Sequence, residues 1–167
     1  MKRTIYASVM MIGMNLVAGI AHAQNQTDPA KTYFSSYLTS KSMGELMLHS
    51  LPTLEDCQSV FNGGDAETYF RSIEEMKSKS GSGSNEGNET FADLRIEHFS
   101  TSDIQQGKGN YAGGMERIVD KLQPGVVFYQ VSLLRKLGDE HGLAFKYWIR
   151  INDRWVFFPK PYAVFEQ

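Results

Sequence analysis

The sequence predicts a single α+β domain in which helices pack against an antiparallel sheet. Apolar residues recur at helical spacing in the first half of the chain and again after residue 114. Apolar and polar residues alternate at 91–99 and in three segments after residue 125, which is typical of strands. The order of helices, strand, helix and three-stranded meander needs only local connections, and this favours helices packed on one face of the sheet.

Length and composition limit the class of protein. The 167 residues correspond to about one domain, and a hydrophobic content of 41% is enough for a packed core. The chain has 17 basic and 19 acidic residues, so it lacks the excess of positive charge typical of nucleic-acid binding, and we expect no such partner. A single cysteine excludes an intramolecular disulfide and a multi-cysteine metal site.

The first 23 residues have the parts of a secretory signal peptide. A basic pair opens the chain, residues 5–20 are mostly apolar, and residues 21–23 (Ala-His-Ala) match the pattern of a cleavage site. A membrane anchor is the weaker alternative, because a spanning helix needs about 20 apolar residues. We therefore expect a mature chain that starts at Gln24, has no membrane anchor and is periplasmic or secreted.

Residues 24–44 are mainly polar and are predicted to form a tether or a poorly ordered arm ahead of a domain at 45–167. The aromatic residues Tyr33, Phe34 and Tyr37 are the exception, because they offer a way to dock this arm onto the domain.

Three helices are expected next along the chain. The first follows the capping-box spacing of Ser42 and Glu45 and ends near Pro52. The second follows Thr53, a favourable N-cap, and the third follows Asp65. The apolar stripes of the second and third helices are Leu54, Cys57, Val60 and Phe61, and Tyr69, Phe70, Ile73 and Met76. Cys57 on its stripe is expected to be a buried, inert thiol.

The second half of the domain begins after a Gly/Ser/Asn-rich segment at 78–89, which is predicted to be a flexible loop. Residues 101–114 are predicted to be a loop, and residues 115–122 have the spacing of an amphipathic helix. Asn152-Asp153 is predicted to be a two-residue hairpin turn. The strands are predicted at 91–99, 126–135, 143–151 and 154–158.

This order of elements, with Trp-Val-Phe-Phe at 155–158, resembles the cystatin-like cone fold of the nuclear-transport-factor superfamily over roughly residues 45–160. That superfamily includes isomerases, dehydratases and many non-catalytic binding domains. The resemblance rests on the order of elements and implies the architecture alone, because the chain matches no catalytic motif of a member.

One predicted sheet face is mostly apolar but carries His98, Tyr129 and Tyr147, which are the predicted ligand-binding residues. A curved sheet would place these polar groups in an apolar cavity, the usual form of a small-molecule site. Asp103 lies five residues after His98 and would orient its imidazole, so this pair is the candidate general base. The alternative is that His98 and the tyrosines have structural roles only.

The opposite face is predicted to carry Trp148, Arg150 and Trp155 beside other charged residues. Because Trp and Arg are frequent anchors in protein interfaces, these three residues form the predicted protein-binding surface. The alternative is a solvated face on which the aromatic rings pair across strands.

The sequence as a whole predicts an exported, non-catalytic binding domain of the bacterial envelope that recognises a protein partner or an apolar small molecule. The alternative function is a small isomerase, dehydratase or hydrolase that needs no cofactor and uses His98 with Asp103. The histidines expected in the mature chain have no ligand spacing, so we expect neither a metal nor a cofactor.

Overall fold

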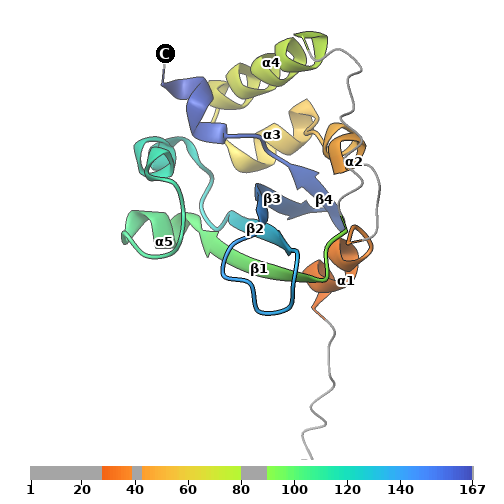
Figure 1. The fold of residues 1–167 in the computed structure, drawn as a ribbon. Coiled ribbons are helices and arrows are strands. Elements are labelled where there is room, and N and C mark those ends of the chain that lie inside the picture. Colours follow the sequence, from red (N-terminus) through yellow and green to blue (C-terminus); the bar gives the residue numbers. More distant parts are fainter. Residues whose placement is uncertain (1–27, 39–42, 80–89, 167) are drawn as a thin grey trace, which may run out of the picture.

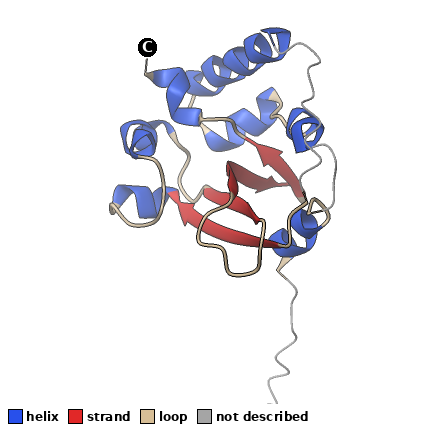
Figure 2. Cartoon of the chain, in the orientation of Figure 1, coloured by secondary structure: helices blue, strands red, loops and turns tan. Residues whose placement is uncertain are grey.

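The computed structural model describes residues 28–38, 43–79 and 90–166, except for the side chains of Met43 and Glu45. Its strands form one antiparallel sheet in which every strand pairs with its neighbour in sequence, and helices surround this sheet (Figures 1 and 2). The predicted α+β class is therefore confirmed. The strands are β1 (Asp93–Ser100), β2 (Val127–Leu134), β3 (Leu143–Ile151) and β4 (Arg154–Phe157).

The helices come mainly before the sheet. Those preceding it are α1 (Pro29–Ser35), α2 (Met43–His49), α3 (Leu54–Val60) and α4 (Gly64–Lys79). The later ones are α5 (Thr101–Gln105) and the 3-10 helices η1 (Gly113–Lys121) and η2 (Pro161–Phe165). Figure 1 shows α1 and α5 at opposite ends of β1, and α3 and α4 on the β4 side of the sheet. Among the described residues no helix has the length and apolarity needed to cross a membrane.

Local sequence sets the start of α3 as predicted. The Thr53 hydroxyl accepts a hydrogen bond from the Asp56 backbone N–H at 3.2 Å, and the Asp56 carboxylate accepts one from the Thr53 N–H at 2.8 Å. This reciprocal pair is a capping box. The buried Asp56 carboxylate also accepts a hydrogen bond from the Arg154 guanidinium, so the same cap ties α3 to β4.

The interpretation of 24–44 as a tether is wrong for α1. The Asp28 carboxylate accepts a hydrogen bond from the Ala30 N–H at 2.9 Å and caps the helix. Phe34 is 1% exposed, and its ring contacts those of Trp148 and Trp155. The polar composition of the segment led to the tether prediction, whereas its aromatic residues indicated docking. The docking of α1 through Phe34 is confirmed, and α1 is part of the domain.

Two further segments differ from the prediction. Residues 101–105 form α5 instead of a loop, because Ser100 and Asp103 make a second capping box. Residues 113–121 form a 3-10 helix where an amphipathic α-helix was predicted over 115–122. The predicted loop at 78–89 begins inside α4, which continues to Lys79, and its remaining residues lie outside the described ones. The predicted signal peptide also lies outside the described residues.

A β-bulge in β3 decides which side chains share a sheet face. Tyr129 pairs with Trp148 whereas Gln130 pairs with Lys146, so Tyr147 is the extra residue, and its φ is 73°. Simple alternation predicted Tyr147 beside Tyr129. The bulge instead returns Trp148 to the face of Tyr129 and directs Tyr147 to the other face, because one inserted residue reverses the alternation.

The core occupies both faces of the sheet, so the expectation that the helices pack on one face alone is wrong. On one face Phe34 of α1 covers Trp148 and Trp155. On the other face Phe158, which follows β4, packs its ring against Tyr69 of α4 and against Phe61, which follows α3. The predicted helical stripe with Cys57 also faces this core, and Cys57 is fully buried as expected.

Candidate functional site

The predicted pair of His98 and Asp103 does not have the geometry of a general base. His98 is exposed on β1, and its ring lies against Tyr129 with centroids 5.7 Å apart. The Asp103 carboxylate accepts hydrogen bonds from both the N–H and the hydroxyl of Ser100, each at 2.7 Å. These bonds lower the pKa of Asp103. The His98 charge also lowers this pKa, but no hydrogen bond joins the two described side chains, so the expected orientation of the imidazole by Asp103 is not observed.

The three predicted polar groups of the apolar face do not converge. His98 and Tyr129 remain neighbours, but the bulge moves Tyr147 to the opposite face, where its ring lies edge-on to Phe99 and Phe128. Tyr129 instead packs edge-on against Trp155 with centroids 4.9 Å apart. The predicted ligand site made of all three residues is therefore wrong, and Tyr147 belongs to a different part of the molecule.

The predicted interface residues are also placed differently. Trp148 is 1% exposed and Trp155 is 7% exposed, because α1 covers both indoles. Only Arg150 of the three is exposed, and it forms an ion pair with Asp153 at 2.8 Å. The expectation of an open face with exposed tryptophans is wrong. The predicted protein-binding surface was based on those exposed tryptophans and therefore has no support from the structure.

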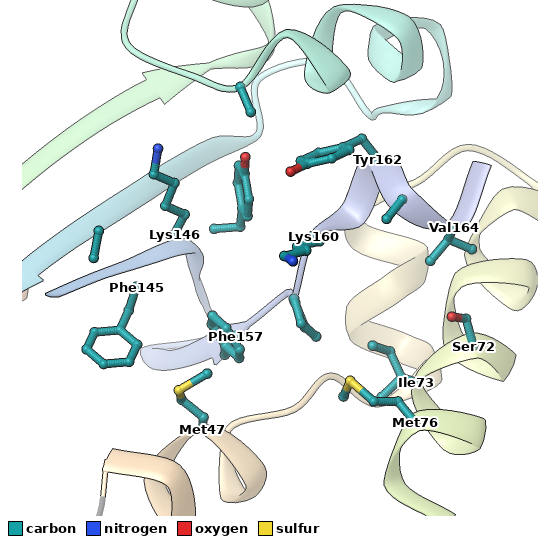
Figure 3. A pocket seen from close by; sticks show the side chains of 15 residues that line it. Met47, Ser72, Ile73, Met76, Phe145, Lys146, Phe157, Lys160, Tyr162 and Val164 are labelled. Carbon is teal, nitrogen blue, oxygen red and sulfur yellow. The ribbon is translucent and has the colours of Figure 1, made fainter. Parts of the chain in front are cut away.

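A hollow that the sequence did not predict lies beside β3. We name it the β3–η2 pocket, and it has a volume of about 800 Å³ (Figure 3). The strand β4 pairs with β3 only over residues 148–151, so the preceding part of β3 has an edge that β4 does not cover. The pocket lies along that edge, and α2, α4 and η2 form its other walls. Its main apolar side chains are Met47, Ile73, Met76, Phe145, Phe157 and Val164.

The chain turns sharply where it leaves β4 and forms the wall of this pocket. Lys160 lies between two prolines and has a φ of 41°, in the left-handed region that a residue with a side chain rarely adopts. Pro161 then begins η2, since proline is favoured in the first turn of a helix. This turn brings Lys160 and Tyr162 to the pocket, with Lys146 of β3 also in the lining.

Two lysines provide the charge of the pocket. Lys146 is half-buried and Lys160 is exposed. Neither is among the described ion pairs or side-chain hydrogen bonds, and no Asp or Glu lines the pocket. The pocket therefore carries positive charge that the described part of the protein does not neutralise.

The Tyr147 hydroxyl is a buried polar group with no hydrogen-bond partner among the described residues. Tyr147 is 3% exposed and lines the pocket. Its burial and the nearby Tyr162 hydroxyl raise the pKa of Tyr147 well above its ordinary value, so the group stays protonated. A buried hydroxyl without a partner is uncommon in folded proteins and calls for an explanation such as a bound molecule.

The sequence lacked a local signature for this pocket because its lining comes from α2, α4, the edge of β3 and the end of the chain. The most informative local pattern was Pro-Lys-Pro-Tyr at 159–162, which predicts an abrupt turn with a lysine at its centre. Comparison with known protein families, characterised proteins and solved structures gave no match.

Proposed function

We propose that this protein is a non-catalytic binding domain that holds an apolar small molecule in the β3–η2 pocket. The observation that carries the proposal is the pocket itself. Its volume of about 800 Å³ lies in the range of about 300–1,000 Å³ that is usual for small-molecule sites. Its lining is mainly aliphatic, aromatic and methionine side chains with a few polar groups, which is also usual for such sites.

The chemistry of the lining supports binding more than catalysis. The described lining contains no carboxylate, imidazole or thiol. The raised pKa of Tyr147 keeps its hydroxyl protonated near neutral pH, so no tyrosinate is present there to act as a base. Cys57 is fully buried elsewhere, and its burial together with the Asp56 carboxylate raises the pKa of this thiol to about 12. The pocket thus provides an apolar surface, two lysine ammonium groups and hydroxyl groups, all of which can bind a ligand.

Export to the bacterial envelope is part of the same proposal and is supported by the signal-peptide pattern of the first 23 residues. Binding of a protein partner remains a prediction from the sequence, and the burial of Trp148 and Trp155 leaves it without an observed surface. The similarity to the cystatin-like cone fold likewise stays a prediction.

The binding proposal is tested with a neutral fluorescent probe, phenylnaphthylamine, whose emission rises in apolar surroundings. We expect saturable binding to the wild-type protein. Ala144 lines the pocket, so Ala144→Trp should fill part of it and weaken probe binding by about tenfold. Ala92 is an exposed alanine outside the lining, so Ala92→Trp is the matched control and should bind the probe as the wild type does.

Circular dichroism would first establish that both variants are folded. Absence of probe binding to the wild type, or equal binding by folded Ala144→Trp and Ala92→Trp, would contradict the proposal. The first result would mean that the pocket does not take apolar molecules, and the second would place the bound probe elsewhere.

A further inference from the structure

We infer that the ligand of the β3–η2 pocket is an amphipathic carboxylate, with an apolar chain at the methionine-lined end and its anionic group at the end of Lys146, Lys160 and Tyr147. The inference rests on the proposed function and adds the chemical class of the ligand. Three observations carry it: the distribution of charge, the backbone conformation and the buried hydroxyl.

The lysine and tyrosine side chains of the pocket lie away from its methionines, although Ser72 lies beside Ile73 (Figure 3). In Figure 3 the labelled side chains of Lys146 and Tyr162 lie in the upper part of the view, with Lys160 below them near the centre. Met47, Ile73 and Met76 lie in the lower part. A ligand that matches this division has one polar end and one apolar end. Methionine side chains are flexible and polarizable, and they suit an alkyl chain because they adapt to its shape.

The charge of the polar end indicates an anion. Elsewhere in the described chain, Lys77 and Lys121 pair with Glu74 and Asp65, whereas the exposed Lys31 and Lys136 are in no described ion pair. Lys146 and Lys160 have no acidic partner among the described residues either, and Lys146 differs from the exposed lysines because it is half-buried beside apolar side chains. Partial burial of an unpaired cation is unfavourable because it removes hydration. A ligand carboxylate would compensate this cost by pairing with the Lys146 ammonium group.

The backbone conformation singles out the same residues. Among the described residues, four that are not glycine have a positive φ. Asn152 and Asp153 form the predicted two-residue turn between β3 and β4, which requires that conformation. The other two are Tyr147 in the bulge and Lys160 between two prolines, and both line the pocket. Strained residues of this kind gather at ligand sites, where the fold holds a side chain in a set position.

The Tyr147 hydroxyl completes the polar end. Tyr162 and the Ala112 backbone lie close enough to affect it, yet neither has hydrogen-bond geometry toward it. The raised pKa of Tyr147 leaves a proton available for donation at neutral pH. A carboxylate oxygen accepts hydrogen bonds without donating one, so it matches a buried donor that has no acceptor.

Calorimetric titration with decanoate, decanol and decylamine tests the ligand class, because these molecules share a chain and differ in their head group. We expect decanoate to bind the wild type about tenfold more tightly than decanol, and decylamine to bind most weakly. Lys146→Gln and Lys160→Gln should each weaken decanoate binding by about threefold to tenfold and leave decanol binding unchanged. Lys136→Gln changes an exposed lysine outside the pocket and should have no effect.

Tyr147→Phe provides a second test that does not alter charge, and it should also weaken decanoate binding more than decanol binding. Equal binding of decanoate and decanol, or equal loss in Lys146→Gln and Lys136→Gln, would overturn the inference. Binding of phenylnaphthylamine without preference for decanoate leaves the proposed function intact and rejects only the ligand class. Failure of every probe, phenylnaphthylamine included, rejects both.

Discussion

The ring of Phe34 in α1 packs edge-on against the indole of Trp148 in β3, with centroids 5.1 Å apart. The same ring lies 5.0 Å from the indole of Trp155. One residue from a mainly polar segment therefore covers both tryptophans of the chain. This relationship is the reason that a sheet face predicted to be open is part of the core.

We expect Phe34→Ala to lower the free energy of unfolding by about 3 kcal/mol or more, because it leaves a cavity over two indoles. Urea denaturation followed by tryptophan fluorescence measures this loss. Lys31→Ala, at an exposed position of the same helix, should change stability by less than about 0.5 kcal/mol. If Phe34→Ala were as stable as Lys31→Ala, the packing of α1 against the two tryptophans would not contribute to stability in solution.

Two buried tyrosines should respond in opposite directions to loss of the hydroxyl. The Tyr69 hydroxyl donates to the Pro159 carbonyl at 3.1 Å, so Tyr69→Phe should cost about 1 kcal/mol of stability. The Tyr147 hydroxyl has no hydrogen-bond partner among the described residues, so Tyr147→Phe should leave the ligand-free protein at least as stable as the wild type. Thermal melting in the absence of ligand measures both. A loss in Tyr147→Phe equal to that in Tyr69→Phe would indicate a hydrogen bond at Tyr147.

The capping box of α5 should be visible in the titration of Asp103. A carboxyl group whose pKa is lower in the folded protein than in the unfolded chain stabilises the fold at pH values above its unfolded-state pKa. This contribution is lost as the pH falls through the folded-state pKa. For Asp103 the ordinary pKa is 3.8, so its contribution is complete at neutral pH and disappears on acidification below 3.8.

Ser100→Ala removes the hydroxyl that contributes most to this shift, so it should raise the pKa of Asp103 toward 3.8. Carbon NMR of the carboxyl group during an acid titration measures the change. Ser102→Ala is the control, because the Ser102 hydroxyl contacts Gln106 instead of Asp103. An Asp103 pKa that is the same in wild type and Ser100→Ala would refute the capping role of the hydroxyl.

Cys57 should be unreactive in the folded protein. It is fully buried, and its pKa of about 12 keeps the thiol protonated near neutral pH, whereas the thiolate is the reactive form. Ellman's reagent at pH 8 should label the native protein far more slowly than the urea-unfolded protein. Equal labelling rates would mean that the native core opens readily around α3.

Local features of the sequence were enough to predict several elements. Alternation located β3 at Leu143–Ile151, and Thr53 with an acidic residue three positions later set the start of α3. The prediction succeeded at these places because an N-cap and a strand period are decided by residues a few positions apart. The buried state of Cys57 also followed from its position on an apolar stripe.

The candidate site was not predictable in the same way. The bulge at Tyr147 inserts one residue in β3 without a change in hydrophobic period, and it reverses which side chains share a face. Phe34 and Trp148 are more than a hundred residues apart in sequence, and their contact depends on the return of α1 to the sheet.

The sequence by itself determined the α+β class, the order of its strands and the starts of some helices, because these depend on hydrophobic period and local hydrogen bonds. Only the tertiary structure decided which face each tryptophan occupies and where a pocket forms. Lys146 and Lys160 line the same pocket for two reasons. The strand β4 does not cover the first part of β3, and the chain turns at the two prolines that flank Lys160. Such proximity arises from packing between distant segments, and no periodicity within one segment encodes it.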